Sequence, residues 1–170
     1  MINIIDPESD TPMMHPKTPV VILADCSGAG KDAFLQKLIV ELKERGCRTG
    51  VIKYSACQME IDQPGKDTWR HARAGADVVA LAARDRLAVV RRSATVPELE
   101  EILNLVKGVD LIIVDGYEGD NDIAGRLIIP VEELLNLVRQ PAPVEGVPFC
   151  ALDEVPAVAD LLIQRCSLPK

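Results

Sequence analysis

Aliphatic runs alternate with amphipathic stretches along most of this chain. Residues 20–24 are all apolar and predict a buried strand. Residues 33–42 predict a helix, because their larger apolar side chains recur on one helical face, and Gly46 is a suitable stop. The apolar positions of that face are Phe34, Leu35, Leu38, Ile39 and Leu42. This order of strand and helix begins an α/β pattern.

The same alternation continues beyond the first helix. Apolar and turn residues predict further strands at 48–55, 109–116 and 127–131, and helices at 64–74, 95–108 and 155–164. Pro64 stands near the start of one helix, and Thr95 with Glu98 has the spacing of a capping box. Residues 78–82 and 87–90 predict a β-hairpin. We therefore expect a mostly parallel sheet flanked by helices, with a hairpin insertion.

The strand predicted at 109–116 ends in an acid. Four successive aliphatic residues precede Asp115, as is typical of a central parallel strand that is buried on both faces. Ligands of open α/β sheets bind at the carboxyl ends of such strands. Asp115 thus has the position of a Walker B acid, which holds Mg²⁺ or a water bound to it. The alternative is a strand-end aspartate that caps a turn with Gly116.

Residues 25–32 (DCSGAGKD) resemble a phosphate-binding loop between the first strand and the first helix. Backbone N–H groups of this loop would surround a phosphate, and Lys31 would reach the β- and γ-phosphates. The predicted nucleotide contacts are Ser27, Gly28, Ala29, Gly30, Lys31 and Asp32. The alternative is a glycine-rich turn that binds nothing.

Two positions depart from the pattern G-x-x-x-x-G-K-[S/T]. Asp25 replaces its first glycine, and Asp32 replaces its hydroxyl residue. The Asp32 carboxylate can bind Mg²⁺ together with Asp115, but it would also repel phosphate oxygens. An acid in the first turn of a helix is also favourable without any ligand, because it faces the positive end of the helix dipole.

A basic cluster follows the second strand. Lys66, Arg70 and Arg73 surround Trp69, the only tryptophan of the chain. These cations could contact an anionic partner or a phosphate. The alternative is an ordinary amphipathic helix with a solvated charged face.

Composition narrows the class of protein. A net charge of −7 argues against nucleic-acid and anionic-membrane partners, and no apolar run reaches the ~18 residues of a membrane span. The five cysteines are scattered without a C-x-x-C pair, which favours reduced thiols in a cytoplasmic protein. Residues 1–19 hold four prolines and are expected to form a disordered leader. Residues 20–170 are expected to form a single P-loop NTPase-like domain.

Three segments resemble the molybdopterin-guanine dinucleotide biosynthesis protein B (MobB) family. Residues 62–76 (DQPGKDTWRHARAGA) are similar to the family's D-x-P-G-K-D-S-x-R-x-x-x-A-G-A. Residues 110–118 (DLIIVDGYE) are similar to D-L-x-L-V-E-G-F-K, with Asp in place of Glu. Residues 152–160 also resemble the family's ending. The resemblance covers the chain from about Val20 to Gln164.

The resemblance implies a homodimeric P-loop protein that binds GTP with Mg²⁺ and has at most weak GTPase activity. It also implies a partner, the guanylyltransferase that attaches GMP to the molybdenum cofactor, or a related maturation protein. By the family's pattern, Gly28, Gly30 and Lys31 match phosphate contacts and Asp115 matches the metal-associated acid. No residue is assigned a catalytic role.

The chain also departs from the family. The element K-H-x-H-H-D-F is replaced after Lys53 by Tyr-Ser-Ala-Cys-Gln-Met, and no P-K-I element is recognisable near Arg126. Asp25 and Asp32 stand where the family has Gly and Thr. A scaffold that kept the fold and partner surface but binds or hydrolyses no nucleotide is therefore the alternative, and a P-loop kinase is a third possibility.

Overall fold

The computed structural model describes residues 18–23, 29–55, 59, 61–117, 119, 128–130 and 154–169. The chain divides into two compact units, Met1–Ile52 with Val106–Lys170, and Lys53–Leu105. Residues 1–17, which belong to the expected leader, lie outside the described residues. That residues 20–170 form a single domain stays a prediction. In the part of the chain that is described, no helix has the length and apolar character to cross a membrane.

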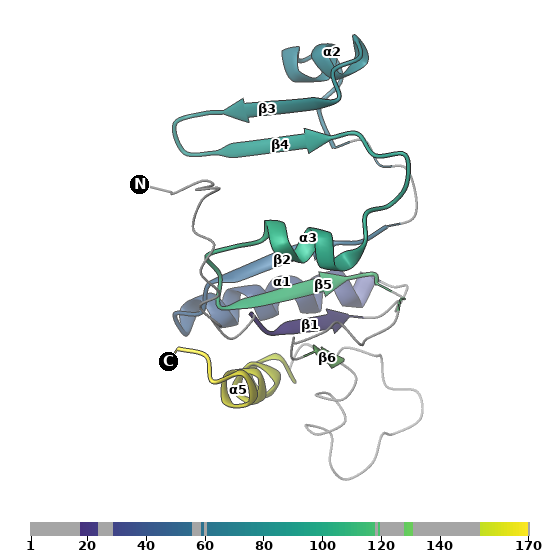
Figure 1. Ribbon diagram of the computed structural model, residues 1–170. Helices are drawn as coiled ribbons and strands as arrows, with labels where there is room; N and C mark the ends of the chain where they lie inside the picture. The colour runs from purple at the N-terminus through teal and green to yellow at the C-terminus, as the bar shows by residue number, and fades with distance from the viewer. Residues whose placement is uncertain are drawn as a thin grey trace, which may run out of the picture. The chain divides into compact units, whose positions relative to one another are not determined.

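A four-stranded sheet in the order β2-β5-β1-β6 forms the centre of the first unit (Figure 1). The strands are β1 (Val20–Leu23), β2 (Thr49–Lys53), β5 (Leu111–Asp115) and β6 (Ile128–Pro130). β1 pairs in parallel with β5 on one side and with β6 on the other. Every residue of β1 and β5 is buried, which agrees with the predicted central strands. The mostly parallel α/β sheet is confirmed.

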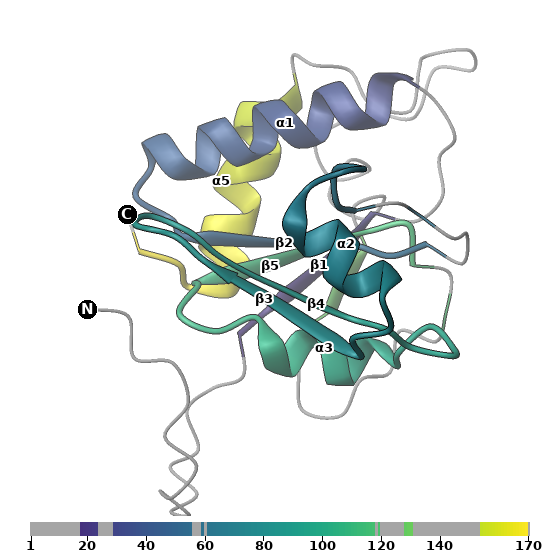
Figure 2. The same cartoon turned by 90° about the horizontal axis from the view of Figure 1, so that it is seen from above.

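Two helices, α1 (Ala29–Glu44) and α5 (Val155–Cys166), lie side by side on one face of this sheet (Figure 1, Figure 2). Alternate strand residues point to that face, because successive side chains of a strand point to opposite sides. They include Val21 and Leu23 of β1 and Leu111 and Ile113 of β5. Phe34, Leu38 and Leu42 of α1 and Val158 and Leu162 of α5 complete an aliphatic core. The predicted buried face of α1 is therefore correct.

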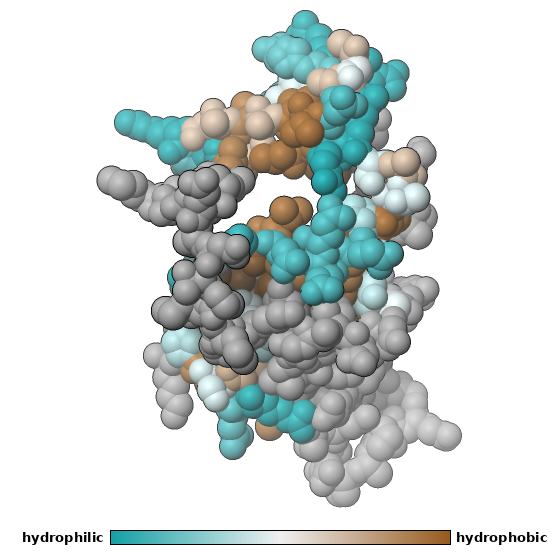
Figure 3. All heavy atoms as spheres, in the orientation of Figure 1, coloured by the Kyte–Doolittle hydropathy of each residue, from teal (hydrophilic) through white to brown (hydrophobic). Residues whose placement is uncertain are grey.

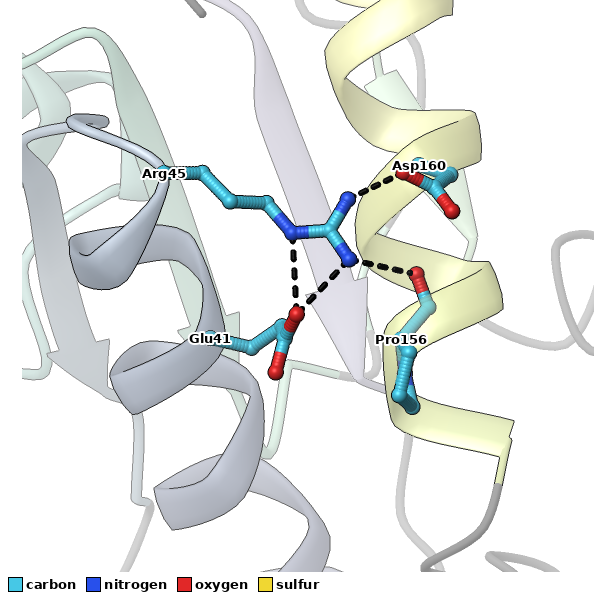
Figure 4. Close-up of polar contacts among 4 residues, drawn as sticks. All are labelled: Glu41, Arg45, Pro156 and Asp160. Atoms are coloured by element: carbon cyan, nitrogen blue, oxygen red, sulfur yellow. Dashed lines mark hydrogen bonds and ion pairs between the residues drawn. The ribbon is translucent and has the colours of Figure 1, made fainter.

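Arg45, just beyond the end of α1, joins the two helices (Figure 4). Its Nε and Nη2 donate to Glu41 Oε1 at 2.9 and 2.7 Å, its Nη1 pairs with Asp160, and its Nη2 also donates to the Pro156 carbonyl at 3.3 Å. The hydrogen bond to Glu41 is the largest cause that raises the pKa of Arg45. The planar guanidinium thus contacts three groups on two helices.

The second unit contains α2 (Asp67–Arg73), β3 (Val78–Ala82), β4 (Leu87–Arg91) and α3 (Leu99–Leu105). β3 and β4 form the predicted antiparallel hairpin, paired from Val78↔Arg91 to Ala82↔Leu87. The Ala83 N–H donates to the Arg86 carbonyl at 2.8 Å and closes the turn. α2 contacts β3 on one face of this hairpin.

Two predicted helix starts are wrong. Gly65 has φ +86° and Lys66 is extended, so α2 begins at Asp67 and not at Pro64. α3 begins at Leu99, and the Glu98 carbonyl accepts from Ile102 N–H at 3.3 Å, in place of a capping box at Thr95. Pro97 explains the second shift, because a proline disfavours helical geometry in the residue before it.

An ion pair between the exposed Arg48 and the partly buried Asp110 joins the residues that precede β2 and β5. Asp110 accepts the Arg48 backbone N–H at 2.9 Å and two bonds from its guanidinium, at 3.1 Å from Nε and 2.7 Å from Nη2. The side-chain hydrogen bond from Arg48 is the main reason that the pKa of the Asp110 carboxyl lies below its ordinary value of 3.8. A carboxyl whose pKa is lowered by folding stabilises the protein above its unfolded pKa.

We expect Asp110→Asn to lower the free energy of unfolding at pH 7. Because the pKa is lowered in the folded state, this difference should be constant down to about pH 5 and shrink as the pH falls through 3.8. Urea unfolding of both proteins across this pH range measures it. In an Arg48→Met background the larger part of the pH-dependent difference should disappear. A difference that grows on acidification would contradict the lowered pKa.

Candidate functional site

The carboxyl ends of β1 and β5 lie next to each other. In the register of these strands Leu23 stands opposite Asp115, and the Gly116 N–H donates to the Leu23 carbonyl at 3.1 Å. β1 leads toward α1 through residues 24–28, which lie outside the described residues. The last residue of β5 is therefore placed at the sheet edge from which α1 departs, where ligands of α/β sheets bind.

A buried ion pair occupies this edge. Lys31, in the first turn of α1, places its Nζ 2.8 Å from Asp115 Oδ1, and the two side chains are 9% and 4% exposed. Burial removes both charges from water, so each needs an oppositely charged or polar partner close by. The structure thus brings together the cation of the predicted phosphate loop and the acid of the predicted Walker B strand.

The other predicted loop residues are described in part. Ala29 and Gly30 are the first residues of α1, whereas Ser27 and Gly28 lie outside the described residues. Asp32 is exposed in the first helical turn. α1 begins four residues earlier than predicted, so the loop's Gly-Lys segment is already helical. An anion at this end of α1 would meet backbone N–H groups and the Lys31 ammonium.

A magnesium ion fits this site only together with a phosphate ligand. Among the described residues no group of three His, Cys, Asp or Glu side chains could hold a metal ion. Mg²⁺ commonly takes one or two carboxylates and completes its octahedron with water and substrate phosphate oxygens. Asp115 would supply such a carboxylate, and Asp32 stands where the loop pattern has a hydroxyl. When bound, the ion would neutralise phosphate charge.

The cysteines of the described residues offer little nucleophilic chemistry. Cys47 and Cys166 form no disulfide. Burial raises the pKa of both thiols, that of Cys166 to about 11. Since the thiolate is the reactive form, both side chains are poorly reactive near neutral pH.

The basic cluster predicted around Trp69 lies on and before α2, in the second unit. Arg70 Nε donates to the Gly65 carbonyl at 3.1 Å, and its Nη2 lies 3.3 Å from Asp67. Lys66 is the exposed N-cap residue of α2. The Arg73 guanidinium lies over the Trp69 ring, 5.3 Å from its centre.

Arg92 adds a further cation near this cluster that the sequence pattern does not predict. Its Nη2 donates to the Ala72 carbonyl of α2. The one feature of the sequence that could have indicated Arg92 is its position two residues after Val90. Residues two apart in extended chain point to the same side.

The comparison with known protein families decides the classification. Residues 20–123, more than half of the chain, match the family described as "Molybdopterin guanine dinucleotide synthesis protein B". The chain belongs to the MobB family. The match includes β1, the helix α1 that carries Lys31 and the strand β5 that carries Asp115. It also includes the whole second unit.

Two curated relatives support this membership. Each is named "Molybdopterin-guanine dinucleotide biosynthesis adapter protein". The protein from Haemophilus influenzae is 35% identical over 107 residues, which cover 62% of this chain and 60% of the relative. The Escherichia coli protein is 35% identical over 105 residues, or 59% of each protein. The chain thus matches somewhat less than two thirds of the length of these relatives.

Solved structures agree on the fold. The crystal structure of Bacillus subtilis MobB superimposes with a TM-score of 0.60 at 22% identity, covering 86% of this chain and 97% of that one. The α/β, P-loop NTPase-like architecture of this chain is therefore that of solved MobB proteins. The hairpin in residues 53–105 belongs to the matched region.

We expect Lys31→Met to lower the free energy of unfolding by about 3–5 kcal/mol. Asp115 would then lose the ammonium that compensates its charge on a buried strand. Removing one partner of a buried ion pair is strongly destabilising for this reason. The double variant Lys31→Met/Asp115→Leu should lie within about 1 kcal/mol of the wild type, because it buries no charge.

Urea unfolding of the wild type, both single variants and the double variant measures this coupling. If each single variant costs less than about 1 kcal/mol, the pair is hydrated and the buried geometry is not maintained in solution.

Proposed function

We propose that this MobB-family protein is a GTP-binding accessory protein of molybdenum cofactor maturation, in the step that forms molybdopterin guanine dinucleotide. The observation that carries the proposal is the contact between Lys31 and Asp115 at the carboxyl edge of the sheet. The names of the 35%-identical relatives supply the pathway. Hydrolysis of GTP would be weak or absent.

A bound nucleotide would change the partners of this ion pair. Lys31 would bind phosphate oxygens through its ammonium, and Asp115 would hold Mg²⁺ through its carboxylate. Both charges would remain compensated throughout. In the absence of ligand, the two buried charges compensate each other as an ion pair at 2.8 Å.

Asp32 sets the electrostatics of binding in this proposal. Its carboxylate replaces a neutral hydroxyl near the bound phosphates, so it repels them unless a cation lies between. Binding of a nucleoside triphosphate should therefore depend on Mg²⁺ more strongly than in a protein with Thr at this position. A scaffold that binds no nucleotide is the second candidate, and the same substitution favours it.

We expect Asp32→Thr to strengthen GTP binding at least about tenfold without Mg²⁺, equivalent to about 1.4 kcal/mol, and by less with Mg²⁺. Calorimetric titration of GTP and ATP with and without the ion measures both effects. Asp32→Asn is the matched control, because it removes the charge and keeps the size. If repulsion is the cause, Asn and Thr should improve metal-free binding equally.

Three other outcomes decide between the candidates. Tight metal-free GTP binding by the wild type would contradict the repulsion. Binding by Asp32→Thr but not by the wild type in either condition would favour the scaffold. Absence of binding in all variants would remove the nucleotide from the proposal and leave only the scaffold.

We also propose that the protein is a homodimer and that it acts with the guanylyltransferase of this pathway or a related maturation protein. The hairpin supports self-association. Val79, Leu81, Ala88 and Val90 line a small cavity with Thr68 of α2, so they face the helix. Val78, Leu87 and Val89 lie on the opposite side, and each is more than half exposed. Figure 3 shows apolar side chains gathered along β3 and β4.

We expect Val89→Lys to shift the protein toward monomer in sedimentation velocity experiments over a range of concentrations. A new charge next to Val78 and Leu87 would lose its hydration in an interface. Val40→Lys is the control, since Val40 of α1 is 55% exposed against 60% for Val89. A wild type that is monomeric at all concentrations, or equal dissociation of both variants, would contradict the proposed interface.

A further inference from the structure

The second unit contains a pocket distinct from the site at Lys31. It has a volume of about 770 Å³ and lies between the segment before α2, the helix itself and the end of β4. That volume is within the range of about 300–1,000 Å³ that is usual for small-molecule sites. The residues that line it include Ile61, Asp62, Trp69, Arg73, Val90 and Arg92.

The positive charge of the pocket comes from two elements. Arg73 belongs to α2, and Arg92 follows β4, where its N–H donates to the Asp77 carbonyl at 3.0 Å and extends the ladder by one residue. Because Arg92 is two residues beyond Val90, both lie on the face toward α2. Two guanidinium groups at one pocket, in a chain of net charge −7, form a local site for an anion.

The walls of the pocket are suited to a flat ring. The Arg73 guanidinium lies over the half-buried indole of Trp69, 5.3 Å from the ring centre, within the range of a cation–π contact. Ile61 and Val90 add apolar surface. Aromatic side chains bind conjugated rings by stacking, and this depends little on the identity of the ring.

A carboxylate adds a preference for a ring with N–H groups. Asp62 lines the same pocket, and its Oδ1 accepts the N–H of Gln63 at 2.8 Å, which fixes the side chain. A carboxylate accepts hydrogen bonds at both oxygens and would repel a ligand that presented only acceptors or further anionic groups there. The ligand must therefore place its negative charge at the arginines and its N–H edge at Asp62.

From this arrangement we infer that the pocket binds a phosphorylated nitrogen heterocycle. Its ring lies against Trp69, its phosphate binds Arg73 and Arg92, and an amino or ring N–H group donates to Asp62. Purine nucleotides and phosphorylated pterins share this chemistry. The inference does not depend on nucleotide binding at Lys31, because the two sites share no residue.

Trp69 allows a direct test, because it is the only tryptophan and its emission reports on the pocket alone. The intact chain is titrated with GMP, guanosine and inorganic phosphate, with excitation selective for tryptophan and calorimetry in parallel. We expect GMP to quench Trp69 and to bind at least tenfold more tightly than either half. Pterin-6-carboxylate, an anionic pterin, serves as the second ring source, and its affinity relative to GMP identifies the preferred ring.

Arg73→Gln and Arg92→Gln should each weaken GMP binding about tenfold or more. Arg86→Gln is the matched control, because Arg86 precedes β4 as Arg92 follows it and is exposed beside Asp85. It should change the affinity less than twofold. All three variants keep Trp69 and replace exposed side chains, so their folding can be verified by thermal unfolding before titration.

The variant Lys31→Met/Asp115→Leu separates this pocket from the nucleotide site. The Trp69 response to GMP should persist in it, even if all GTP binding is lost. Loss of the response in this variant would assign GMP to the Lys31 site and overturn the inference. Equal affinity for phosphate and GMP would overturn ring recognition, and an unchanged affinity in Arg73→Gln and Arg92→Gln would overturn the pocket.

Discussion

The parallel pairing of β1 with β5 is the constraint on which the rest of the structure depends. It places Leu23 beside Asp115 and so fixes where the first strand ends relative to the acid. One face of the pair then receives α1 and α5, whose aliphatic side chains fill the core. Only within this register does Lys31, in the first turn of α1, reach the Asp115 carboxylate. A slip by one residue would turn Asp115 to the other face of the sheet.

Much of this fold can be predicted from the sequence, because strong local patterns specify it. The aliphatic run before Asp115 and the period of Phe34, Leu38 and Leu42 match their observed burial. The predicted helix starts are wrong near Gly65, which has a positive φ, and near Pro97, after which α3 begins. The Lys31–Asp115 contact can be expected from the motifs, whereas the pocket at Trp69 cannot. Its side chains come from three segments whose approach depends on hairpin register and the placement of α2.

Charge distribution gives the protein two different kinds of candidate site. At Lys31 and Asp115 two opposite charges are buried and compensate each other. A ligand there must therefore replace one member of the pair as the partner of the other. Arg73 and Arg92 are exposed, and the residues that line their pocket include two arginines and one carboxylate, Asp62, so an anionic ligand would compensate the remaining positive charge of the lining. A nucleotide bound at the first site would therefore need a cation, whereas the affinity of an anion for the exposed arginines would fall as the salt concentration rises.

The division of the chain has a consequence for its synthesis. Residues 53–105 are continuous, and the hairpin partners Ala82 and Leu87 are close in sequence, so these contacts need only short loops. β1 pairs with a strand about 90 residues later, and that closure carries the greater entropic cost. During synthesis on a ribosome, the hairpin can form before β5 has emerged to pair with β1. The sheet edge at Lys31 is therefore completed late. It forms after the second unit, which separates β1 from β5 in the sequence.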